Sequence, residues 1–147
     1  MKRDIYTEIA ASLIVLLFVY AGISKLTDMP LFVKDMEKQP LPDWLKMPLV
    51  WVIPFTEIII AGLLVFKKTR LAGFYAAAII LFAFTCYTIL VLSLFFGKIP
   101  CSCGGFIRTL SWPQHLLLNL FFLLVSVAAI MYRQKLKRAA ESSPTAR

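Results

Sequence analysis

Four long apolar segments dominate the sequence, and each is long enough to cross a lipid bilayer. They cover about residues 5–26, 49–66, 71–96 and 112–132. A spanning helix needs about 20 mostly apolar residues, because all its backbone hydrogen bonds must be made within the segment. The chain has 147 residues and 60% of them are hydrophobic, so no water-soluble domain is left over. The sequence therefore predicts an all-α membrane protein with four transmembrane helices.

This domain is expected to occupy residues 1–138. The remaining stretch, 139–147, is small and polar, and we expect it to be a disordered tail. Lys2 and Arg3 precede the first apolar segment as they would in a signal peptide, but no A-x-A-like cleavage site follows. We therefore expect the first segment to be retained as a transmembrane helix.

The distribution of basic residues predicts the orientation in the membrane. Uncompensated basic residues flank the two termini and the second connection. They are Lys2, Arg3, Lys67, Lys68, Arg70, Arg133, Lys135, Lys137 and Arg138. Cytoplasmic loops carry an excess of Lys and Arg, so four crossings place both termini in the cytoplasm of a bacterial inner membrane. The net charge of +8 is explained by this clustering beside the spans, and we expect no nucleic-acid binding.

A Cys-x-Cys pair lies in the third connection, which this orientation places in the periplasm. The stretch reads "IPCSCGG", with Cys101 and Cys103 followed by Gly104 and Gly105. A disulfide across one spacer residue is strained and therefore easily exchanged. Pro100 stiffens the entry, and the two glycines let a partner approach closely. The pair thus favours thiol–disulfide exchange, with a static disulfide or two inert thiols as the simpler alternative.

Metal binding by this pair is not expected. A structural zinc site needs four ligands, and His115 is the only nitrogen ligand nearby in the sequence. Cys86 lies within the third apolar segment, far from the pair, and is predicted to be a small packing residue.

The last span begins just after this connection. Ser111 and Gln114 form an S-x-x-Q capping box that predicts its start. His115, Asn119 and Ser126 then fall on one helix face, which a membrane helix turns toward the bundle interior. His115 is a weak candidate for a proton partner of a cysteine thiol. The simpler alternative is that it only satisfies a neighbouring backbone carbonyl.

One acidic residue, Glu57, lies deep in the second span. A charge at this depth is costly and normally has a partner inside the bundle. Lys25 closes the first span on the same side and can reach it. The pair is predicted either to fix the packing of the two helices or to bind a polar group.

The connection between the first two spans mixes charged and apolar residues. Residues 30–38 are predicted to form a short amphipathic helix at the membrane interface, where Trp44 and Trp51 would also lie. The alternative is a plain connector without a further role.

Three motifs carry a resemblance to a known family. They are "AGISKL" ending the first span, "PFTEIIIAGLL" containing Glu57 in the second, and "GKIPCSCGG" with "LSW" before the last. Together they resemble the MauE family, within the DoxX-like superfamily of four-helix membrane proteins. Gly104 stands where the familiar form of the signature has Phe. The resemblance implies a role in maturing periplasmic disulfide-containing proteins with a thioredoxin-like partner, and it implies that Cys101 and Cys103 are the redox pair.

Three functions compete at this point. The first is thiol–disulfide exchange with the thioredoxin-like partner. The sequence leaves open whether the chain itself catalyses this exchange. A quinone is a candidate cofactor, although quinone-linked four-helix oxidases usually carry further loop cysteines that this chain lacks. The second is a non-catalytic membrane anchor or assembly factor. The third is a small-molecule or lipid-binding bundle that uses Lys25 and Glu57.

Overall fold

Helices make up almost all of the chain that the computed structural model describes, residues 5–97 and 110–142. They are α1 (Ile5–Thr27), α2 (Met29–Glu37), α3 (Asp43–Val65), α4 (Arg70–Leu92) and α5 (Trp112–Glu141). Four of them, α1, α3, α4 and α5, are long and apolar enough to cross a membrane. The predicted all-α architecture with four spanning helices is confirmed.

Two helices extend beyond the apolar runs that predicted them. α3 begins at Asp43 rather than near residue 49, because the prediction followed hydropathy and the first turns carry polar residues and Trp44. α5 continues to Glu141, past the predicted end near residue 132. The added residues are mostly Lys, Arg, Ala, Leu and Gln, which favour helix, and Lys137 lies 3.9 Å from Glu141 one turn later.

α4 ends earlier than predicted. Its last helical residue is Leu92, whereas the apolar run continues to about residue 96. Leu94 has a positive φ of 57°, and Gly97 has a φ of 79°. The chain therefore leaves the helix in a turn, although its side chains remain apolar.

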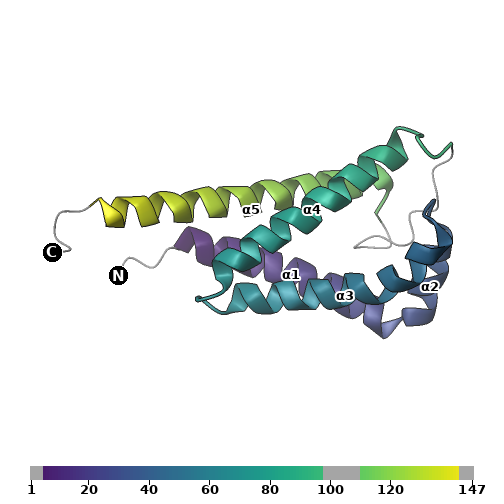
Figure 1. Cartoon of the computed structure of the whole chain (residues 1–147), viewed down its shortest axis with the longest axis horizontal. Coiled ribbons are helices and arrows are strands. Elements are labelled where there is room, and N and C mark those ends of the chain that lie inside the picture. Colours follow the sequence, from purple (N-terminus) through teal and green to yellow (C-terminus); the bar gives the residue numbers. More distant parts are fainter. Residues whose placement is uncertain (1–4, 98–109, 143–147) are drawn as a thin grey trace.

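The four long helices form a bundle in which α1 packs against α3 and α4 packs against α5 (Figure 1). The start of α1, the α3–α4 connection and the end of α5 lie at one end of the bundle. The short helix α2, the start of α3, the end of α4 and the start of α5 lie at the other end. We call this second end the α2 end.

The core of the bundle is apolar and contains residues from all four long helices. Its fully buried members include Ile14, Phe18, Leu64, Phe74 and Leu81. Large apolar side chains also cover the outer surface, for example Leu16, Ile59, Ile79 and Leu124, each more than 60% exposed. Such an outer face suits lipid rather than water, in agreement with the length of the helices.

Arg70 links helices by hydrogen bonds at the end of the bundle opposite α2. Its Nε donates to the carbonyl of Leu64 at 2.9 Å, near the end of α3. Its Nη1 donates to Glu8 Oε1 at 2.9 Å, on α1. The guanidinium is buried and satisfies one of the carbonyls that the end of α3 leaves without a helical partner. Arg70 thus ties three helices together at one point.

Candidate functional site

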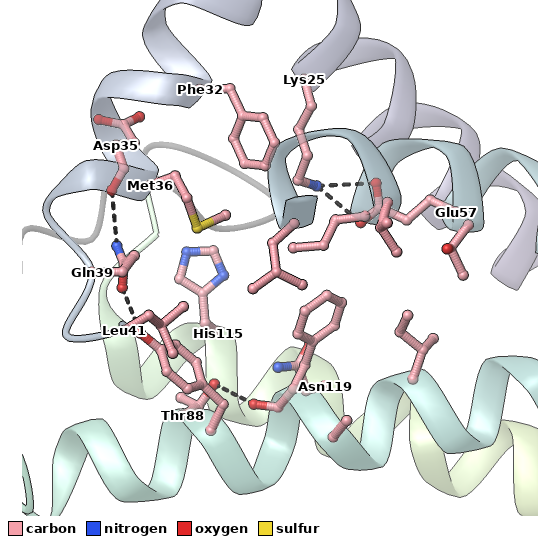
Figure 2. A pocket seen from close by; sticks show the side chains of 18 of the residues that line it. Lys25, Phe32, Asp35, Met36, Gln39, Leu41, Glu57, Thr88, His115 and Asn119 are labelled. Carbon is pink, nitrogen blue, oxygen red and sulfur yellow. Dashed lines mark hydrogen bonds and ion pairs between the residues drawn. The ribbon is translucent and has the colours of Figure 1, made fainter. Parts of the chain in front are cut away.

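A cavity of about 340 Å³ lies inside the α2 end of the bundle. It is bounded by all five helices and by the residues that follow α2 (Figure 2). Most of its lining is apolar, and a few polar groups converge on it. The polar lining residues are Lys25, Asp35, Gln39, Thr56, Glu57, Tyr87, Thr88, His115 and Asn119. A largely apolar pocket with a small number of convergent polar groups is the usual form of a small-molecule site.

The structure brings Lys25 and Glu57 together as a buried ion pair. Lys25 Nζ lies 2.9 Å from Glu57 Oε1 and 3.1 Å from Oε2, and it also donates to the Ala21 carbonyl at 3.3 Å. Glu57 is fully buried and Lys25 is 7% exposed. The ring of Phe32 adds a cation–π contact, with its centroid 5.8 Å from Nζ. The charges neutralise each other inside the bundle.

The close approach of α1 to α3 explains why this pair can form. Gly22 and Pro54 lie one turn before Lys25 and Glu57. A Cβ at Gly22 would lie 2.8 Å from the end of the Ile58 side chain and 3.3 Å from the Pro54 carbonyl. The absence of a side chain at Gly22 therefore lets the helices pack at this level, and it brings the two charged groups within hydrogen-bonding distance.

α5 contributes His115 and Asn119 to the cavity from its first turns. They are 4% and 3% exposed, and Figure 2 shows the imidazole projecting from α5 into the cavity toward Met36. The helix start is held by the backbone N–H of Ser111, which donates to Gln114 Oε1 at 2.8 Å. Ser126, farther along the same face, is also buried but lies outside the cavity lining.

α2 forms the cover of the cavity and is fastened to α4 by a hydrogen-bonded chain. Tyr87 Oη donates to Gln39 Oε1 at 2.7 Å, and Gln39 Nε2 donates to the Asp35 carbonyl at 3.3 Å. The side chains of Phe32 and Met36 are buried on the inner face of α2. The predicted helix at residues 30–38 thus exists, and its apolar face packs on the bundle.

The cysteine pair and its neighbours fall outside the described residues. Cys101 and Cys103 lie in the segment 98–109, together with Pro100, Gly104 and Gly105. The described chain resumes at Leu110, shortly before Trp112 and His115, both of which line the cavity. Cys86 is a half-buried free thiol on α4.

The described residues contain no group of three or more side chains that could hold a metal ion. The convergent groups of the cavity are instead hydrogen-bonding groups and one ion pair. Gln39, Tyr87 and Asp35 were not among the residues singled out from the sequence. Asp35 lies within the amphipathic pattern of α2. Gln39 follows α2 and Tyr87 lies on α4, and no sequence pattern indicates that these two side chains meet.

Comparison with known families identifies the chain at the family level. Residues 3–132 match the family described as "Methylamine utilisation protein MauE". The chain belongs to the MauE family. The matched region covers α1 to α4 and α5 as far as Tyr132, so it includes every residue that lines the cavity. No match was found among curated proteins or among solved structures. The chain is thus a multi-pass membrane protein of a family named for methylamine utilisation.

Proposed function

We propose that this MauE-family protein takes part in thiol–disulfide exchange at the outer face of the bacterial inner membrane. Cys101 and Cys103 are the exchanging pair, and the partner is a thioredoxin-like periplasmic protein. The proposal also places the chain in the wider DoxX-like superfamily. It rests on the chemistry of the Cys-x-Cys pair and on where the flanking helices end.

The observation that carries the proposal concerns α4 and α5, the two spanning helices that flank the cysteine pair in the sequence. α4 ends and α5 begins at the α2 end (Figure 1). The basic clusters of the α3–α4 connection and of the end of α5 lie at the opposite end. The positive-inside rule then favours a periplasmic α2 end, and the periplasm is an oxidising compartment in which cysteine pairs form disulfides.

The exchange needs only thiols and disulfides. One cysteine thiolate attacks a partner disulfide, which gives a mixed disulfide and releases one partner thiolate. The second cysteine then attacks the mixed disulfide, which closes the Cys101–Cys103 bond and releases the reduced partner. The same steps run in reverse when the partner is the reductant. His115, buried in the first turn of α5, is proposed to hold the proton that a cysteine gives up.

Trapping of the mixed disulfide tests the proposal. We would express Cys103→Ser and Cys101→Ser in a Cys86→Ser background, alkylate thiols in acid and analyse the membranes without reductant. One of the two variants should accumulate an adduct that dithiothreitol cleaves and whose second chain carries a thioredoxin-like Cys-x-x-Cys motif. The matched control is Cys86→Ser alone, which keeps the resolving cysteine and should accumulate none.

A different result would favour the non-catalytic anchor. In that case neither variant forms an adduct, although both reach the membrane at the level of the parent protein. Replacing both cysteines with Ser would then weaken the association with the partner without abolishing it. The exchange proposal does not survive this combination.

A further inference from the structure

In the part of the chain that the structure describes, the exposed side of the cavity lies between α3 and α4. Val52 on α3 and Ala83 on α4 both line it and are both exposed. Val52 is 55% exposed, and its neighbours Trp51 and Phe55 are similarly exposed on the outer surface. α3 and α4 meet at their connection and diverge toward this end (Figure 1). The described residues therefore leave a way into the cavity from the hydrocarbon region of the bilayer.

The charges of the cavity favour a neutral ligand. The ammonium of Lys25 is engaged by both carboxylate oxygens of Glu57. Asp35, the remaining charged residue among the described residues of the lining, lies 3.5 Å from Lys38. Within the described lining, Lys25 and Glu57 are thus paired with each other, and Asp35 is paired with Lys38, whose side chain is partly exposed. A phosphate headgroup would have to compete with Glu57 for Lys25, and desolvating its charge would be costly.

The apolar lining is suited to a flat ring. Phe32, Phe84, Tyr87 and Trp112 come from three different helices and face the same space. Tyr87 and Trp112 already contact each other, with ring centroids 6.3 Å apart. Aromatic side chains stack on planar rings or meet them edge to face, with a gain beyond the buried area.

Asn119 adds a polar group to this largely apolar lining. The residue is 3% exposed and lines the cavity, yet its Oδ1 accepts no hydrogen bond from any residue that the structure describes. An unsatisfied buried carbonyl costs about 1–3 kcal/mol. A ligand that offers a donor at this point removes that cost. A ligand that only accepts is bound through the amide NH₂, once the amide turns so that Nδ2 faces it. The amide of Asn119 and the imidazole of His115 can each donate or accept a hydrogen bond.

From these observations we propose that the cavity binds the ring of a membrane quinone. A quinone is neutral, flat and soluble in the bilayer, and its tail would leave through the opening between α3 and α4. Its ring oxygens accept hydrogen bonds when oxidised and donate them when reduced, which amide and imidazole groups match in both states. The residues assigned to this site do not include Cys101 or Cys103, and quinone binding does not require thiol exchange.

Tryptophan fluorescence can test the binding directly. The chain has three tryptophans, and of these only Trp112 lines the cavity. A Trp44→Phe/Trp51→Phe variant in phosphatidylcholine nanodiscs therefore reports on this site alone. Decylubiquinone or menadione should quench Trp112 in a saturable way, and decanol, a tail without a ring, should not.

Variants separate specific binding from partitioning into lipid. Asn119→Leu should bind the quinone about tenfold more weakly, as expected for one lost hydrogen bond in a buried site. Ala83→Leu, which narrows the opening without removing a polar group, should weaken binding at least as much. Ser126→Ala is the matched control on the same face of α5 and should bind as the parent does. Cys101→Ser/Cys103→Ser should also bind as the parent does, whether or not the thiol-exchange proposal holds.

Three results would overturn the proposal. The first is quenching that rises linearly with the quinone content of the bilayer and is equal in the parent and in both cavity variants. The second is quenching by decanol to the same extent. The third is a phospholipid that copurifies one to one and that neither quinone displaces. If Asn119→Leu fails to fold, Ala83→Leu alone decides between these outcomes.

Discussion

The ion pair between Lys25 and Glu57 offers the sharpest test of the structure. Glu57→Gln keeps the size of the side chain and removes its charge. The ammonium of Lys25 then retains the Ala21 carbonyl at 3.3 Å and the ring of Phe32, but it loses its counter-ion. At 7% exposure it cannot regain full hydration from water. The variant therefore leaves a charge buried in an apolar bundle.

The size of the effect follows from the geometry. Removing one partner of a buried ion pair costs about 3–5 kcal/mol, because the remaining charge is left uncompensated. In Glu57→Gln the amide oxygen of the new side chain can still accept one of the two hydrogen bonds, so we expect a loss of about 3 kcal/mol. Lys25→Met leaves the carboxylate buried and should cost a similar amount. The double variant, in which both charges are removed, should lie within about 1 kcal/mol of the parent protein.

The parent, the two single variants and the double variant form a double-mutant cycle. Reversible unfolding in mixed micelles with increasing dodecyl sulfate, followed by circular dichroism, gives the free energy of unfolding of each of the four proteins. The expected coupling energy is at least about 5 kcal/mol, because the two single losses together exceed the loss of the double variant by that amount. The predicted role of the ion pair is refuted if both single variants have the same free energy of unfolding as the parent protein. It is equally refuted if the double variant is destabilised by the sum of the single losses, because the two groups would then act independently.

Three further predictions concern packing. Arg70→Met should lower the free energy of unfolding by about 2 kcal/mol, whereas Lys67→Met, which is exposed and 3.9 Å from its partner, should change it little in the same titration. Gly73→Ala should be destabilising because its Cβ would lie 3.0 Å from a backbone nitrogen of α3, and Gly62→Ala, with open space around it, should be neutral or stabilising in a thermal melt. Tyr87→Phe should speed amide hydrogen exchange in α2, and unchanged exchange there would show that this bond does not hold the cover.

The number and the approximate position of the spanning helices could be predicted from the sequence, because hydropathy over about 20 residues is a local property. The partnership of Lys25 with Glu57 could also be anticipated. Each is conspicuous as an ionisable residue in or beside an apolar run, and few partners lie at the same depth. The polar face of His115, Asn119 and Ser126 follows from helical periodicity alone, and all three residues are buried.

The cavity could not be predicted, because it depends on how the helices diverge. Whether Val52 and Ala83 face each other across an opening is set by the angle between α3 and α4. That angle depends on packing where Gly73 of α4 meets Leu64 of α3, nearer the α3–α4 connection than Val52 and Ala83 are. The contact of Tyr87 with Gln39 likewise joins residues from two separate elements. A helical end such as Glu141 is missed when only the apolar run is counted.

The redox state of Cys101 and Cys103 in membranes of growing cells tests the central claim most directly. Acid quenching followed by alkylation with a heavy maleimide counts free thiols, and Cys86→Ser removes the third cysteine from the count. The account predicts a mixture of reduced and oxidised chains that shifts within minutes toward the dithiol when dithiothreitol is added, and back when it is removed. A pair that stays fully reduced, or a disulfide that dithiothreitol cannot open in the native membrane, would contradict it.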